Sequence, residues 1–124
     1  MYTLEDFKEE VTKTKAKMEE LAAYLKTIDA AVKKQLESWD LDGCAKQLQK
    51  YMIPEMEKLL QQAETETLPL KYRRNQLGSY YYIIDSWPCT SKPDRNKNPE
   101  IWDRLQEVGH MLSHLDRHYR EDLP

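Results

Sequence analysis

The sequence predicts an all-α protein, and three observations lead to this fold class. Apolar residues recur at alternating steps of three and four along much of the chain, which is typical of amphipathic helices. Only three of the 124 residues are Gly, so the chain is poor in a residue that tight β-turns need. Two segments begin with patterns typical of helix starts. We therefore expect one domain, residues 1–124, folded as a small bundle of four or five helices.

The first predicted helix covers residues 4–38 and is much the longest. Thr3 is suited to be its N-cap, and Asp6 stands three residues later in the capping-box position. Tyr2 and Phe7 are placed to form a hydrophobic staple across this cap. Neither Pro nor Gly interrupts the segment. Such a helix would extend about 52 Å at ~1.5 Å per residue, which is unusually long for so small a domain.

A heptad-like apolar seam follows this helix, formed by Leu4, Phe7, Val11, Thr14, Met18, Leu21, Leu25, Ile28, Val32, Gln35 and Trp39. The seam leaves two alternatives open, namely packing within the chain and pairing with a second chain, including a homodimer. In the second case the predicted partner-binding residues are Leu4, Phe7, Val11, Met18, Leu21, Leu25, Ile28 and Val32.

The second predicted helix covers about residues 43–64. Pro54 should bend or break it, because Pro has no N–H and its ring clashes with the preceding turn. The apolar positions of this helix are Leu48, Tyr51, Met52, Met56, Leu59, Leu60 and Ala63.

Two further helices are predicted, at about residues 70–86 and 99–120, with a Pro-rich basic loop at 87–98 between them. The last helix has a clear start signal, with Asn98 as N-cap and Pro99 as the first helical residue. Its apolar stripe consists of Ile101, Leu105, Val108, Leu112, Leu115 and Tyr119.

One segment is basic in an otherwise acidic chain. The net charge is −3, whereas residues 71–98 hold six basic and two acidic residues, a local charge of +4. The neighbouring Glu64 and Glu66 could neutralise part of this charge. The alternative is an anion or a nucleic-acid backbone. The residues that would bind it are Lys71, Arg73, Arg74, Lys92, Arg95 and Lys97.

All three histidines form one row on the last predicted helix. His110, His114 and His118 are spaced four apart, and they face away from its apolar stripe. The row fits a solvated surface, a partner interface or a metal site for an ion such as Zn²⁺, with Glu107 as a further ligand. Only the last of these predicts metal binding at Glu107, His110, His114 and His118.

No sequence motif indicates catalysis or a cofactor, and we expect neither. Neither Cys44 nor Cys89 has zinc-type spacing, and we expect two free thiols in the cytoplasm. No run of about 18 apolar residues predicts a membrane span, and the acidic start does not resemble a secretory signal. The sequence thus favours a non-catalytic protein–protein interaction module, such as an adaptor, a small subunit or a regulator. Nucleic-acid binding is the alternative and metal binding the third hypothesis.

Overall fold

The computed structural model of the chain describes residues 2–31, 41–68, 80, 99–121 and 123. The secondary-structure elements in this part of the chain are all helical, so the predicted all-α class is confirmed. The elements are α1 (Leu4–Thr27), α3 (Leu41–Gln47), the π-helix η1 (Leu48–Met52), α4 (Ile53–Glu64) and α6 (Pro99–Glu121).

The described helices form three rods, not the four or five helices predicted. One rod consists of α3, η1 and α4, which follow one another without a gap, so the break at Pro54 that would have given a fifth helix does not occur. The helix predicted at 70–86 and the basic loop at 87–98 lie outside the described residues, except Tyr80, which is helical. That part of the predicted bundle stays a prediction.

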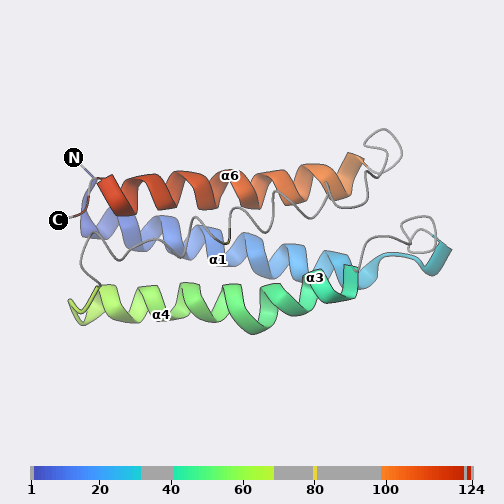
Figure 1. Ribbon diagram of the computed structural model, residues 1–124, viewed down its shortest axis with the longest axis horizontal. Helices are drawn as coiled ribbons and strands as arrows, with labels where there is room; N and C mark the ends of the chain where they lie inside the picture. Colours follow the sequence, from blue (N-terminus) through green and yellow to red (C-terminus); the bar gives the residue numbers. More distant parts are fainter. Residues whose placement is uncertain (1, 32–40, 69–79, 81–98, 122, 124) are drawn as a thin grey trace.

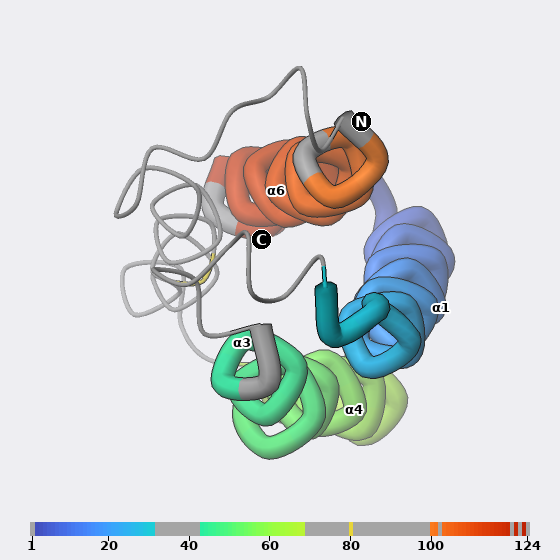
Figure 2. Tube along the Cα trace, turned by 90° about the vertical axis from the view of Figure 1, so that its right-hand side faces the viewer, coloured from blue at the N-terminus to red at the C-terminus, as the bar shows by residue number. Residues whose placement is uncertain are grey.

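The three rods lie side by side, with α1 in contact with both α6 and the α3–α4 rod (Figure 1). A view along the rods shows α6 and α4 on two sides of a common interior, joined by α1 (Figure 2). Both α4 and α6 run antiparallel to α1, so the two ends of the chain lie at the same end of the molecule (Figure 1).

The interior is filled by apolar residues of all three rods, most of them members of the predicted stripes. From α1 it takes six members of the heptad-like seam, five apolar residues and Thr14, each at most 1% exposed, together with Ala22. The whole predicted stripe of α6 is buried too. The buried apolar residues of the described chain are Phe7, Val11, Met18, Leu21, Ala22, Leu25, Ala45, Leu48, Met52, Ile53, Met56, Leu59, Ala63, Ile101, Leu105, Val108, Leu112, Leu115, Tyr119 and Leu123.

The start of α1 has the predicted capping box. The backbone N–H of Asp6 donates to Thr3 Oγ1, and the backbone N–H of Thr3 donates to Asp6 Oδ2, each at 3.1 Å. The two rings expected to form a staple stack on α6. Tyr2 stacks on His118 and Phe7 on Tyr119. The cap therefore also fixes the start of α1 against the end of α6.

The predicted extent of the first helix, residues 4–38, is wrong, because α1 ends at Thr27. Ile28 is extended, with φ −66° and ψ 131°. Thr27 Oγ1 donates to the carbonyl of Tyr24 at 2.8 Å, and the backbone N–H of Ala31 donates to Asp29 Oδ1 at 2.7 Å. The side chains of Thr27 and Asp29 thus satisfy backbone groups on both sides of the break. Thr and Asp can end and start a helix in this way, so the break needs neither Gly nor Pro.

The bend predicted at Pro54 takes the form of the π-helix η1. The backbone N–H of Ile53 donates to the carbonyl of Leu48, five residues back, and Pro54 lies in the first turn of α4. A wider turn just before Pro54 relieves the clash that Pro makes with an ordinary helical turn. The rod therefore continues through Pro54 as one piece.

We predict that Leu21→Ala lowers the free energy of unfolding by about 2–5 kcal/mol, because Leu21 is 1% exposed and its removal leaves a cavity in the interior. Urea unfolding followed by circular dichroism would measure the loss. Ala23→Ser, at an exposed position of the same turn, should stay within about 0.5 kcal/mol of the parent protein. Equal effects of the two substitutions would contradict this packing.

We predict that the capping box makes stability depend on pH. The hydrogen bond from the backbone N–H of Thr3 lowers the pKa of the Asp6 carboxyl. A carboxyl with a lowered pKa stabilises the folded state above its unfolded pKa, and this contribution is lost as the pH falls through the folded pKa. Asp6→Asn should therefore lower the melting temperature at pH 7, and the difference should shrink at a pH below about 3.9.

Melting curves by circular dichroism at neutral and acidic pH would measure this difference. Asp103→Asn, which removes an exposed carboxylate from α6, controls for the loss of one negative charge. The same pH dependence in both variants would show that the capping box is not its source.

Candidate functional site

The predicted partner-binding seam of α1 is used inside the chain. Its members up to Leu25 are buried, except the half-buried Leu4, which packs against the core as Ile28 does. Val32 lies outside the described residues. The sequence leaves open whether the seam packs within the chain or pairs with a second chain, and in the structure it packs within the chain. A second chain could use this seam only by displacing α4 or α6, so a surface for partners has to be sought elsewhere.

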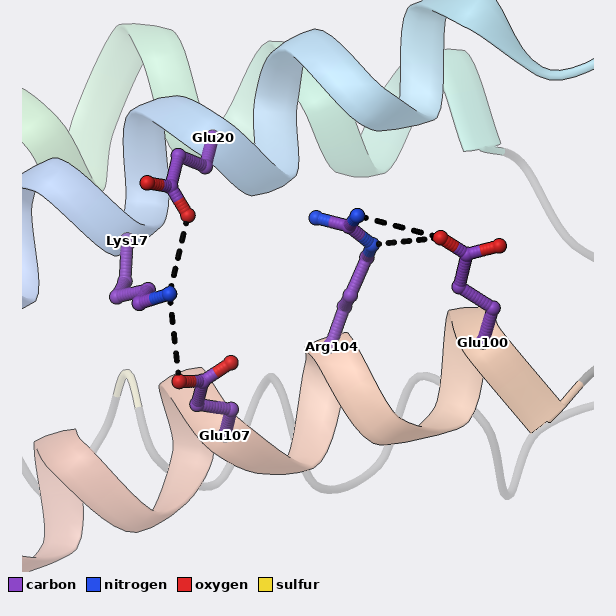
Figure 3. A network of polar contacts seen from close by, with 5 residues as sticks. All are labelled: Lys17, Glu20, Glu100, Arg104 and Glu107. Atoms are coloured by element: carbon purple, nitrogen blue, oxygen red, sulfur yellow. Dashed lines mark hydrogen bonds and ion pairs between the residues drawn. The ribbon is translucent and has the colours of Figure 1, made fainter.

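A network of charged side chains joins the exposed edges of α1 and α6 (Figure 3). Lys17 Nζ lies 3.1 Å from Glu20 on its own helix and 3.4 Å from Glu107 on α6. The hydrogen bond to Glu20, and then the charge of Glu107, raise the pKa of Lys17. Lys15 acts similarly on the other side of α1, at 3.4 Å from Glu19 and 3.6 Å from Glu57 on α4. These lysines connect α1 to both neighbours.

The second part of this network surrounds Arg104 (Figure 3). Its Nε and Nη2 donate to Glu100 Oε1 at 3.3 and 3.2 Å, and its guanidinium lies 4.2 Å from the centre of the Tyr24 ring. Burial, and then the negative charge of Glu100, raise the pKa of Tyr24. These partly exposed ion pairs and the cation–π contact hold α1 and α6 together. They offer no nucleophile paired with a base, so we assign them a structural role.

The histidine row is divided between solvent and a ring cluster. His110 and His114 are exposed, whereas His118 is half-buried. The rings of His114 and His118 lie 4.3 Å apart, and Tyr2 stacks on His118 at 4.4 Å. Glu107, the predicted fourth ligand, pairs with Lys17. Within the described ranges, no three His, Cys, Asp or Glu residues are arranged to hold a metal ion.

The predicted anion-binding residues cannot be placed in the same way. Lys71, Arg73, Arg74, Lys92, Arg95 and Lys97 all lie outside the described residues, as does Cys89. Cys44 is half-buried in α3 beside the core. The nucleic-acid hypothesis therefore stays a prediction from the sequence.

The outward face of the α3–η1–α4 rod carries the exposed aromatic side chain of the described structure. Tyr51 is 55% exposed, and no other large apolar side chain in the described part of the chain is as open to solvent. Lys50 Nζ lies 5.6 Å from the centre of its ring. Tyr51 belongs to η1, and π-helical turns are frequent at functional sites. This combination makes the face around Tyr51 our candidate functional site.

Three lysines of the α3–η1–α4 rod differ from most lysines of α1, where only Lys26 is exposed without an ion pair to a described residue. Lys8, Lys13, Lys15 and Lys17 each pair with a glutamate. Lys46, Lys50 and Lys58 are exposed and form no ion pair with any described residue. Pro54 is exposed among them. We call this set the outer strip, and it consists of Lys46, Lys50, Tyr51, Pro54 and Lys58.

The sequence pattern assigned Tyr51 to the core, and this prediction is wrong. Tyr51 stands three residues after Leu48, only about 60° from it around a helix, but five residues before Met56, about 140° away. The buried stripe follows Leu48, Met52 and Met56, so the ring points outward. The spacing to Met56, with Pro54 between them, was the signal for its exposure.

Comparison with protein-family models, curated proteins and solved structures finds no match for this chain. No helix in the described residues has the length and apolar character needed to cross a bilayer. The candidate site is therefore assigned from the chain's own geometry.

We predict that Lys17 and Glu107 stabilise the protein jointly and that this coupling depends on salt. A double-mutant cycle with Lys17→Met and Glu107→Gln isolates the pair. The coupling energy should be favourable at low ionic strength and fall towards zero in about 1 M NaCl, where the Debye length is near 3 Å. A cycle with Lys13→Met and Glu107→Gln, which form no pair in the structure, is the control. Equal coupling in both cycles would contradict the α1–α6 contact.

Proposed function

We propose that this protein is a non-catalytic protein–protein interaction module, an adaptor, small subunit or regulator, that binds its partner through the outer strip. The observation that carries the proposal is the exposure of Tyr51 on a π-helical turn. Tyr is enriched among the residues that dominate binding energy at interfaces, because its ring provides a large contact area with few rotatable bonds. An exposed Tyr on a rigid helix is well placed for this role.

The surroundings of Tyr51 support the same proposal. The rod beneath it is anchored by Leu48 and Met52, both at most 1% exposed, so the ring stands on a fixed base. All five residues of the outer strip are exposed, so a partner can approach them without unfolding the core. The seam of α1, by contrast, is occupied within the chain.

Two earlier expectations remain proposals. The cytoplasm is the compartment we expect, on the basis of the cysteine pattern of the sequence. Nucleic acid is the alternative partner, through the basic segment 71–98, and a nuclease treatment separates it from a protein partner.

Site-specific crosslinking would test the proposed function. A photoreactive phenylalanine analogue replaces Tyr51, and in two control proteins it replaces Ala23 on α1 or Ser113 on α6, both exposed. Lysate from the native organism is divided into nuclease-treated and untreated halves before irradiation. We expect one protein to crosslink from position 51 in both halves and not from the control positions.

The captured protein is then purified and tested for binding to the unmodified chain. Tyr51→Ser should weaken this complex at least about tenfold, the effect of removing an interface residue worth 1.4 kcal/mol, while Ala23→Ser should leave it unchanged. Equal crosslinking from all three positions, or a nuclease-sensitive signal, would overturn the proposal.

A further inference from the structure

The α3–η1–α4 rod separates its charges by direction. Of its glutamates, Glu57 is directed towards α1, where it pairs with Lys15 at 3.6 Å. Glu55 is half-buried. It lies near Tyr80, whose own burial and then the negative charge of Glu55 raise the pKa of the phenol. Glu55 and Glu57 thus interact with residues outside the rod, whereas the lysines of the outer strip do not pair with them.

The spacing of these lysines follows the helix. Lys46 and Lys50 are four residues apart, which corresponds to about 6 Å along the rod, and Lys58 lies about 12 Å further on. In an extended peptide every second residue points the same way, at a repeat of about 6.6–6.8 Å. Carboxylates at alternate positions of an extended segment therefore match the lysine spacing.

We infer that the partner presents an acidic segment to the outer strip, with carboxylates on the lysines and an apolar side chain on the ring of Tyr51 and on Pro54. This inference rests on the proposed function and names the chemistry of its partner. Charge complementarity carries it. Three exposed lysines that pair with no described residue, one of them 5.6 Å from the centre of the exposed Tyr51 ring, favour a negatively charged peptide over a neutral one. The chain's own net charge of −3 disfavours a second copy as the occupant.

Fluorescence anisotropy with a defined probe would test the inference on the full chain. The probe is a fluorescein-labelled octapeptide in which glutamate alternates with leucine and serine. A peptide with lysine in place of glutamate and a single-stranded oligonucleotide are the comparison probes. We expect the acidic peptide to bind, and its dissociation constant to rise with salt.

Two double variants with the same change in net charge locate the binding. Lys46→Glu with Lys50→Glu reverses two charges of the outer strip, and Lys13→Glu with Lys26→Glu reverses two exposed charges of α1. We expect the first pair to weaken binding at least about tenfold and the second pair to change it less than about twofold, because like charges at a contact are strongly unfavourable. The variant with Lys46→Arg and Lys50→Arg keeps both positive charges and should bind the acidic peptide as the parent protein does. Circular dichroism checks that each variant is folded.

Three results would overturn the inference. They are equal losses in both pairs of variants, binding of the basic peptide in place of the acidic one, and binding of the oligonucleotide alone. The crosslinked protein from the preceding experiment distinguishes this failure from failure of the proposed function. If the captured protein no longer binds the Tyr51→Ser variant but still binds the variant with Lys46→Glu and Lys50→Glu, the outer strip is an interface whose partner is not acidic.

Discussion

Burial of α1 on two sides is the interaction on which the rest of the structure depends. One helix supplies the apolar surface against which both α4 and α6 pack. Apolar burial stabilises at about 25 cal/mol per Å² removed from water, so packing on both α4 and α6 lets α1 contribute through two interfaces. The seam is consequently buried within the chain, and a partner bound as proposed above would use an outer face of the molecule.

The break after Thr27 follows from the same constraint. α1 has 24 residues and α6 has 23, and the α3–η1–α4 rod covers residues 41–64. Three rods of matched length bury each other from end to end. A helix continuing straight to residue 38 would extend about 16 Å beyond its neighbours and leave its apolar seam in water. Ending α1 at Thr27 avoids this exposure. Ala30 and Ala31 are helical again, and the backbone N–H of Ala31 donates to Asp29 Oδ1.

Charge has two different uses on this scaffold. Between helices, Lys15 pairs with Glu57 of α4 and Lys17 with Glu107 of α6, and the guanidinium of Arg104 on α6 lies over the Tyr24 ring of α1. These contacts help to align α1 with its neighbours. Such exposed pairs contribute modestly to stability, but they disfavour other alignments of the helices. On the outer strip the lysines have no such task. The difference between paired and unpaired lysines is the physical basis for the proposal that a partner binds the outer strip.

The sequence by itself determined the helical class, the capping box at Thr3 and Asp6, the start at Pro99 and the buried stripe of α6, because these features depend on local hydrogen bonding and on periodicity. It also indicated a disturbance at Pro54. Only the tertiary structure decided that α1 ends at Thr27, since the break reflects the length of the neighbouring helices. The spacing of Tyr51 to Met56 indicated that its ring lies off the buried stripe, but the tertiary structure fixed the exposure, because the helix phase on either side of η1 is set by which side chains reach the core.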